Sequence, residues 1–283
     1  MPHGNVMTVQ TLPDFGGHEV EAEAVRRAAG LISQARLRGT TLKALPDDVC
    51  PADEHEAYAV QDEVHRLLSG NQRGRTVGHK IGCTTPVMQE FLGIPNPCAG
   101  AVFQPTVHFQ EGMLKHAEYL HPGVECELAV SIGSDLPPGK TPHTRESVAH
   151  AVSAVFAGIE IVDDRWEDYT QVSTPELIAD DFFGAGCVLS GPNAGWKELD
   201  MENVRGQMRI NGRTVGEGRG ADILGHPFEA LSWLANSLNE RGAMVRRGEI
   251  VMLGSLVQTN WVNHMDQVEV EIEGIGSTMA WFG

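Results

Sequence analysis

Two glutamates at alternate positions, Glu125 and Glu127, are the first residues in this chain that could do chemistry. They lie in Val124-Glu125-Cys126-Glu127-Leu128, which continues as an apolar run to Ile132 and is typical of a β-strand. Because alternate residues of a strand point to the same face, both carboxylates should leave it on one side. Two like charges on an apolar strand are unfavourable unless a cation lies between them or water surrounds them.

A third glutamate, Glu160, lies in a similar apolar run, Gly158-Ile159-Glu160-Ile161-Val162. Together the three carboxylates could offer oxygen ligands to one hard cation. Ligation by carboxylates alone suits Mg²⁺ or Mn²⁺, whereas zinc prefers histidine or cysteine. Such a site leaves coordination positions open for a chelating substrate and for water. On periodicity alone, the simpler interpretation is an exposed pair, Glu125 and Glu127, and a separately exposed Glu160.

Lys80 is the second candidate, in Gly78-His79-Lys80-Ile81-Gly82, a strand that otherwise has the composition of a buried one. A buried lysine needs a charge partner or a shifted pKa. The flanking glycines allow a ligand or another backbone to approach closely. Lys80 could therefore bind a substrate carboxylate or transfer a proton. The alternative is a lysine that extends to solvent from a strand end. His79 should face the opposite side and serve a structural role.

The elements that must position these residues are mostly strands. We predict strands over 76–81, 101–104, 124–132, 159–162, 186–189, 207–210, 250–253, 267–273 and 277–282. Asn211-Gly212 predicts a hairpin turn. Gly254-Ser255-Leu256 follows a strand and could present backbone N–H groups to an anion, or form an ordinary turn.

Helices are fewer and begin the chain. We predict helices over 18–38, 53–69, 86–92, 146–157 and 227–241, after an irregular arm over 1–17. The composition changes near residues 71–75, so we expect a helical N-terminal part over 1–75 and a β-rich catalytic core over 76–283. Because the order is not a regular β-α-β alternation, we expect an α+β fold rather than a doubly wound sheet or a (β/α)₈ barrel.

The composition excludes several classes of protein. The 283 residues carry a net charge of −17, which argues against nucleic acid and anionic membrane surfaces as partners. No apolar run approaches the roughly 18 residues that a membrane span needs, and the N-terminus has no secretory pattern. The five cysteines are widely spaced without a CxxC pair, as expected for free thiols in a reducing compartment. We therefore expect a cytoplasmic protein.

Several segments share their order with a known superfamily. They are Gly78-His79-Lys80-Ile81-Gly82-Cys83-Thr84-Thr85, Val124-Glu125-Cys126-Glu127, Gly158-Ile159-Glu160-Ile161-Val162, Ile178-Ala179-Asp180-Asp181, Gly216-Glu217-Gly218-Arg219-Gly220, Leu224-Gly225-His226-Pro227, Trp233-Leu234-Ala235, Gly254-Ser255-Leu256 and Ile272-Glu273-Gly274-Ile275-Gly276-Ser277. In this order they resemble the fumarylacetoacetate hydrolase superfamily, and within it the branch of 2-keto-4-pentenoate hydratases and 4-oxalocrotonate decarboxylases. The resemblance covers about residues 20–283.

The resemblance implies a fumarylacetoacetate hydrolase-like fold, a mixed β-roll core with a small helical N-terminal part. It implies a Mg²⁺ or Mn²⁺ ion held by Glu125, Glu127 and Glu160, with Lys80 as the active-site lysine. The superfamily acts on short 2-oxo acids formed during the catabolism of aromatic compounds, and its members form homo-oligomers. A small-molecule 2-oxo acid and further copies of this chain are therefore the expected partners.

Two segments depart from the family pattern. Family hydratases carry an acidic Pro-Asp segment where this chain has Asn96-Pro97-Cys98-Ala99-Gly100, so Cys98 replaces the expected aspartate. Many members have Ala-Asp-Asn-Ala-Ser-Ser-Gly where this chain has Ala179-Asp180-Asp181-Phe182-Phe183-Gly184-Ala185. We expect the substrate to contact Lys80, Cys98, Phe182, Phe183, Ser255 and Leu256.

The implied activity is that of a divalent-metal-dependent carbon–oxygen lyase, a hydratase acting on a short 2-oxo-enoic acid such as 2-keto-4-pentenoate. The substrate would chelate the cation through its carboxylate and 2-oxo oxygen, and Lys80 would pair with the carboxylate or move a proton. Three alternatives stay open. They are a decarboxylase of a 2-oxo-dioic acid of the 4-oxalocrotonate type, a C–C hydrolase of a diketo acid, and a non-catalytic relative that binds 2-oxo acids.

Overall fold

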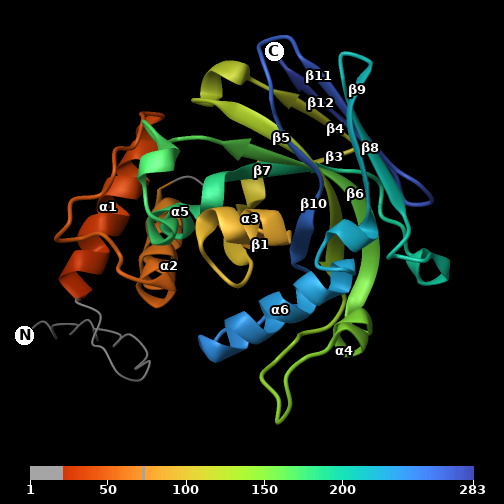
Figure 1. Cartoon of the computed structure of the whole chain (residues 1–283), viewed down its shortest axis with the longest axis horizontal. Helices are drawn as coiled ribbons and strands as arrows, with labels where there is room; N and C mark the ends of the chain where they lie inside the picture. Colours follow the sequence, from red (N-terminus) through yellow and green to blue (C-terminus); the bar gives the residue numbers. More distant parts are fainter. Residues whose placement is uncertain (1–21, 72–73) are drawn as a thin grey trace, which may run out of the picture.

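Two curled sheets with helices at one side and below form the α+β fold that the computed structural model gives for residues 22–71 and 74–283 (Figure 1). The predicted arm over 1–17 and the predicted helix start at residue 18 lie outside these described residues. The mixed fold confirms the predicted α+β class.

The helices follow the predictions closely, except for the one predicted over 146–157. They are α1 (Ala22–Arg38), α2 (Glu54–Gly70), α3 (Pro86–Leu92), α4 (Arg145–Ala149), α5 (Thr174–Ala179) and α6 (Pro227–Glu240). Short 3₁₀ helices are η1 (Gln104–Thr106), η2 (His116–Glu118), η3 (Tyr169–Gln171), η4 (Asp181–Phe183), η5 (Trp196–Glu198) and η6 (Gly220–Asp222).

A seven-stranded sheet positions the candidate residues. Its order is β2 (Cys98–Phe103), β1 (Thr76–Gly82), β10 (Ile250–Trp261), β5 (Pro122–Ile132), β6 (Val152–Asp163), β7 (Gly184–Leu189) and β3 (Val107–Phe109). The sheet curls so strongly that β2 also contacts β7, several strands away in this order. Side chains on distant strands can therefore meet on the concave side of the sheet.

The second sheet covers one side of the first. Its order is β4 (Glu111–Leu114), β12 (Gly276–Phe282), β11 (Gln267–Ile272), β8 (Arg205–Ile210) and β9 (Arg213–Arg219). It packs against β5, β6 and β10, and the core between the sheets contains the fully buried side chains of Met208, Val268 and Val270. The strands β8 and β9 form the hairpin that Asn211-Gly212 predicts.

The helices α1 and α2 lie together beside the sheets, and α6 lies below β10 (Figure 1). α1 buries one apolar stripe, Val25, Ala28, Ala29 and Ile32, as its 3.6-residue periodicity requires. α2 begins where the side chain of Asp53 accepts a hydrogen bond from the N–H of Glu56 at 2.9 Å. α1 and α2 pack against each other, and α2 also packs on α5.

The predicted helix over 146–157 is correct only for its first turn, 146–149, and is wrong from residue 152 onward. α4 ends at Ala149, and β6 begins at Val152. The segment from Val152 contains helix-forming alanines, but it forms β6, which pairs with β5 and is buried on both faces. Because both faces are apolar, its apolar residues do not alternate with polar ones. A strand buried on both faces cannot be told from a buried helix by periodicity alone. The sequence prediction also missed β3, β4 and α5, which are short, and the full lengths of β6 and β10.

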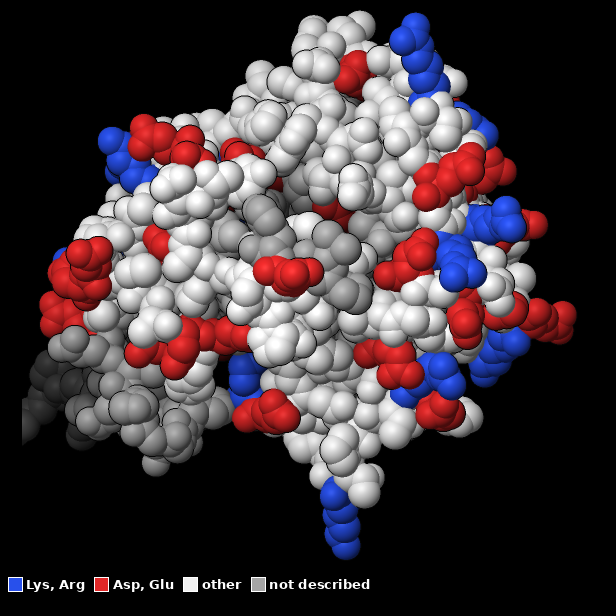
Figure 2. All heavy atoms as spheres, viewed as in Figure 1, with Lys and Arg blue, Asp and Glu red and all other residues white. Residues whose placement is uncertain are grey.

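All five cysteines are free, as predicted. No helix among residues 22–71 and 74–283 is long and apolar enough to span a membrane. On the face drawn in Figure 2, acidic and basic side chains are interspersed, and the basic ones gather into no continuous patch there.

The contact between β1 and β10 gives a test of the fold. A Cβ atom on Gly78 would lie 1.9 Å from the carbonyl oxygen of Ile250, so the two strands approach closely only because residue 78 is glycine. We expect Gly78→Ala to lower the free energy of unfolding by about 1–3 kcal/mol, as overpacking does. Gly30→Ala is the matched control, because a Cβ there meets nothing within 4 Å. In the middle of α1 it should raise stability by about 0.5–1 kcal/mol. Denaturant unfolding measures both, and equal effects would contradict this account of β1.

Candidate functional site

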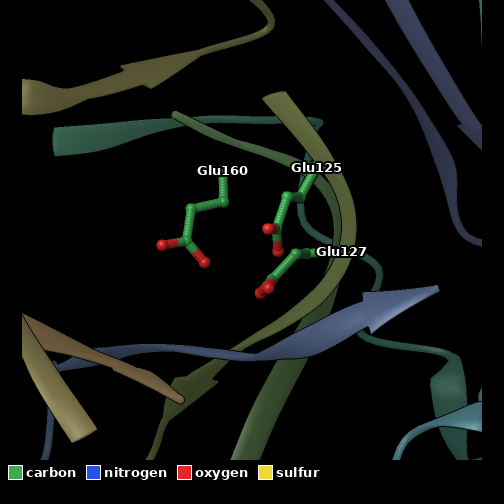
Figure 3. Close-up of side chains that lie close together, drawn as sticks. All are labelled: Glu125, Glu127 and Glu160. Atoms are coloured by element: carbon green, nitrogen blue, oxygen red, sulfur yellow. The ribbon is translucent and has the colours of Figure 1, made fainter. Parts of the chain in front are cut away.

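Glu125, Glu127 and Glu160 converge on the concave side of the seven-stranded sheet (Figure 3). Glu125 and Glu160 are directly opposite each other on the antiparallel strands β5 and β6, and Glu127 is the next residue on the same face of β5. One carboxylate oxygen of each residue lies within 4.8 Å of the others. The convergence that the sequence predicted is therefore present, and the simpler interpretation, an exposed pair of Glu125 and Glu127 with a separately exposed Glu160, is wrong.

These carboxylates are poorly compensated by protein groups. Glu127 and Glu160 are 1% and 2% exposed, and Glu125 is partly buried. Neither oxygen of Glu160 accepts a hydrogen bond of good geometry among the described residues. Burial and the charge of Glu160 raise the pKa of Glu127 well above its usual value and that of Glu125 to about 7. Like charges this close in a buried site favour a bound cation, so the donor set fits a hard divalent ion.

The few hydrogen bonds at this cluster come from β10. The N–H of Gly254 donates to Glu127 Oε2 at 3.2 Å, and the hydroxyl of Thr259 donates to Glu125 Oε1. The charge of Lys80, and after it hydrogen bonds from Thr259 and Ser255, partly offset the rise in the pKa of Glu125. Thr259 is exposed and Ser255 half-buried, so solvent reaches the cluster from the Glu125 side.

Lys80 reaches the same cluster from β1. Its Nζ lies 3.2 Å from Glu160 Oε1, and its side chain is 6% exposed. Burial alone would lower the pKa of Lys80, but Glu160, Glu125 and Glu127 outweigh it and hold this pKa above its usual value. Lys80 is therefore a buried ammonium paired with a carboxylate, as its sequence context required. His79 points elsewhere, and its Nε2 lies 3.5 Å from Glu249.

Phe182 covers Lys80 through both its backbone and its ring. Lys80 Nζ donates to the carbonyl oxygen of Phe182 at 3.1 Å and lies 5.6 Å from the centre of its ring. The carbonyl is presented by η4, in which Asp181, Phe182 and Phe183 have φ values of 57°, 48° and 65°. A left-handed conformation costs about 1–2 kcal/mol per non-glycine residue, so its neighbours must hold this turn in place.

The other residues expected to touch the substrate lie in different surroundings. Phe183 is half-buried and packs its ring edge-to-face with Phe182 and Tyr169. The hydroxyl of Ser255 lies within hydrogen-bond distance of the backbone carbonyl oxygens of Cys126 and Val257, either of which can accept its one hydrogen. Leu256 is buried, and its side chain packs toward Gly206 of the second sheet.

Cys98 is fully buried and donates its S–H to the sulfur of Cys83 at 3.6 Å. The hydrogen bond with Cys83 and burial raise the pKa of Cys98 well above its usual value. A thiol in this state is protonated and cannot replace the acid–base function of an aspartate carboxylate.

Sequence reasoning missed the charged residues that surround η4. Asp181 binds Arg36 and His65, which come from α1 and α2, and Arg165 binds Asp180. The adjacent aspartates Asp180-Asp181 after an apolar helix were a signal that could have prompted a search for buried cations. Their partners lie up to 145 positions away in the sequence, so no spacing rule identifies them.

Comparisons with known proteins agree with this geometry. A family model described as fumarylacetoacetate (FAA) hydrolase C-terminal matches residues 104–280. The 2-keto-4-pentenoate hydratase 1 of Dechloromonas aromatica (strain RCB) is 31% identical over 255 residues, which cover 90% of this chain and 95% of that protein. The 4-oxalocrotonate decarboxylase of Pseudomonas putida is 28% identical over 261 residues, covering 92% of this chain and 97% of that protein.

A solved structure extends the likeness to the fold. The 4-oxalocrotonate decarboxylase from Pseudomonas putida G7, complexed with magnesium and adipate, superposes with a TM-score of 0.87. It is 26% identical, and the match covers 94% of this chain and all of that one. The matching family model, the similar sequences and this fold agree on one assignment. The chain belongs to the fumarylacetoacetate hydrolase family.

Proposed function

We propose that this protein is a divalent-cation-dependent hydratase that acts on short 2-oxo-enoic acids such as 2-keto-4-pentenoate, in the catabolism of aromatic compounds. The observation that carries the proposal is the buried convergence of Glu125, Glu127 and Glu160 beside Lys80. The similarity to 2-keto-4-pentenoate hydratases over nine-tenths of the chain supports the reaction class.

Glu125, Glu127 and Glu160 are the proposed ligands of Mg²⁺ or Mn²⁺. The absence of a hydrogen bond to either oxygen of Glu160 among the described residues supports this assignment. So does the excess of negative charge, which the ion pair with Lys80 offsets only in part. The magnesium in the similar decarboxylase structure also supports a divalent ion. Such an ion supplies a Lewis acid that offsets negative charge developing on the 2-oxo oxygen of the substrate.

Lys80 is the proposed catalytic residue. Its ammonium is held between Glu160 Oε1 and the carbonyl oxygen of Phe182, so its Nζ has a defined position within the cluster. From there it can bind the carboxylate of a 2-oxo acid or donate a proton to the reacting carbon chain. The partly exposed side of the site, near Glu125 and Thr259, is the proposed route for substrate and water.

The surroundings of Lys80 favour a substrate with one carboxylate over a dioic acid. Phe182, Phe183 and the protonated thiol of Cys98 give an apolar neighbourhood. The buried cations nearby, Arg36 and Arg165, are already engaged by Asp181 and Asp180. A second substrate carboxylate would thus find no uncommitted cation among these residues. This supports the hydratase over the decarboxylase that acts on 4-oxalocrotonate.

Three further properties of the protein remain predictions. They are its division into a helical N-terminal part over 1–75 and a catalytic core over 76–283, its cytoplasmic location, and its assembly into a homo-oligomer. Contacts of the substrate with Ser255 and Leu256 are also predictions, and the packing of Leu256 against Gly206 speaks for a structural role of its side chain.

Glu127→Gln tests the cation site. The variant keeps an oxygen for the Gly254 N–H but loses one negative charge. We expect Mn²⁺ affinity, measured by calorimetry, to fall at least about 10–100-fold, with turnover falling at least as much. Because the substitution removes like-charge repulsion, the cation-free variant should melt no lower than the wild type. Glu111→Gln, at an exposed glutamate of β4, is the control and should change none of these quantities. Wild-type Mn²⁺ affinity in Glu127→Gln would refute the ligand assignment.

The pH dependence of thermal stability gives a second test. The pKa of Glu125 is raised from its usual 4.5 to about 7, so the folded state binds a proton more tightly than the unfolded state. Stability of the cation-free protein should therefore fall as pH rises from about 4.5 to 7. A divalent ion binds the ionised carboxylates, so the rise in Tm that it causes should grow over the same window. At about 100 times Kd, near pH 7.5, we expect a rise of about 5–10 °C. A rise independent of pH would contradict the site.

Product analysis tests the reaction. Hydration retains all carbon atoms, decarboxylation releases CO₂, and C–C hydrolysis yields two acids. We expect hydration of 2-keto-4-pentenoate with a kcat/KM at least about 10-fold above that for 4-oxalocrotonate, because the second carboxylate stays unpaired. Release of CO₂ from 4-oxalocrotonate as the faster reaction would favour the decarboxylase. Cation-dependent binding of oxalate or pyruvate without any turnover would favour a non-catalytic relative.

A further inference from the structure

The carbonyl oxygen that fixes Lys80 depends on an unusual turn. Three consecutive non-glycine residues of η4, Asp181 to Phe183, have left-handed backbone conformations. Such residues persist only where the surrounding structure holds them. Two close approaches confine the turn. Cβ atoms on Gly100 and Gly184 would lie 2.9 and 3.1 Å from the carbonyl oxygen of Asp181.

The strongest restraint on the turn is the carboxylate of Asp181, which is fully buried. Its Oδ2 accepts a hydrogen bond from Arg36 Nη1 at 2.7 Å, and its Oδ1 lies 2.6 Å from His65 Nε2. The backbone N–H of Ala101, on β2, also donates to Oδ1 at 3.0 Å. Burial would raise the pKa of Asp181, but His65 and Arg36 outweigh it and hold the pKa far below its usual value.

The two side chains that bind Asp181 come from the N-terminal helices, and both lie beside the same aromatic ring. Arg36 lies near the end of α1, and His65 lies on α2. The guanidinium of Arg36 and the ring of His65 both lie 5.8 Å from the ring centre of Phe103, at the end of β2. Both helices lie outside the segment 104–280 that the family model matches. They are nevertheless joined to the turn that contacts Lys80.

We propose that Asp181 is a positioning residue for Lys80. Bound by Arg36 and His65, Asp181 holds η4 in place. The carbonyl oxygen of Phe182 on this turn then fixes Lys80 Nζ beside Glu160. The helical N-terminal part is thereby required for the geometry of the site. The catalytic consequence rests on the proposed function, because it assumes that Lys80 acts on the substrate. The positional consequence concerns this chain alone.

A positioning role of this network and a purely structural role predict different properties of the variants. A structural role predicts that losing the network lowers stability and leaves folded molecules fully active. A positioning role predicts that folded molecules carry a misplaced Lys80. Displacement of a catalytic group by about 1 Å can cost about 100-fold in rate. The site should still bind the cation at least as tightly, because Glu125, Glu127 and Glu160 lie outside the network, and a displaced Lys80 removes a positive charge from beside Glu160.

The test compares Asp181→Asn, Arg36→Gln and the conservative Arg36→Lys with the wild type. The control is Val64→Ala, which opens a cavity at a fully buried position of α2 and lowers stability while leaving the side chains of Asp181, Arg36 and His65 in place. Three quantities are measured below the melting temperature of every variant: kcat and KM separately, Mn²⁺ affinity, and the acetylation rate of Lys80. Peptide mass spectrometry gives this rate relative to the exposed Lys140.

We expect Asp181→Asn and Arg36→Gln to lower kcat about 10–100-fold with KM within about 3-fold, and to raise the relative acetylation of Lys80 about 5–10-fold. Arg36→Lys should keep kcat and the acetylation of Lys80 close to their wild-type values, and Val64→Ala should change neither quantity. If Asp181→Asn does not fold, Arg36→Gln decides the matter alone. Unchanged Lys80 acetylation and kcat in a folded Asp181→Asn or Arg36→Gln protein overturns the proposal. An inactive wild type whose Lys80 responds as expected refutes the proposed function but retains the positioning.

Discussion

Repulsion among three buried carboxylates is the constraint on which this structure depends. Glu125 and Glu160 are opposite each other on adjacent antiparallel strands, a pairing that is unfavourable for like charges in any sheet. Burial weakens the screening that water would provide, and the pKa values of Glu125 and Glu127 rise as a result. Either protonation or a cation at this point relieves the repulsion, and above about pH 7 a cation is what remains. Lys80 supplies one positive charge, and a divalent ion would neutralise the remaining negative charge of the carboxylates.

The curl of the seven-stranded sheet makes this meeting of charges possible. β1 and β6 are separated by β10 and β5 in the sheet order, yet Lys80 on β1 reaches Glu160 on β6 at 3.2 Å. In a flat sheet, strands lie about 4.8 Å apart, so residues three strands apart could not form an ion pair. The second sheet and α6 pack against the outside of the curled one and keep it closed. Much of the hydrophobic core thus serves to bring four charged groups together.

The sequence predicted the part of the site that follows from strand periodicity. Glu125 and Glu127 share a face because they are two residues apart, and Lys80 was recognisable as a charge in a buried strand. The position of Glu160 opposite Glu125 depends on strand register, which no local pattern encodes. The same limit explains why the predicted helix over 146–157 ran past α4 into β6, where burial on both faces removed the alternation that identifies a strand. The family resemblance provided the convergence that periodicity could not.

The ion network around Asp181 was beyond prediction for a different physical reason. Its members are common charged residues on unremarkable helices, and only tertiary packing brings Arg36 and His65 to one carboxylate. The network also differs from the glutamate cluster in its charge balance. Asp180 and Asp181 face the guanidinium groups of Arg36 and Arg165, so the charges of this cluster balance without a ligand, whereas the glutamates retain an excess of negative charge. Lys80 and the Phe182 carbonyl join the two clusters. The self-compensated network can therefore act as a rigid support, and the uncompensated one is where a cation and an anionic substrate would bind.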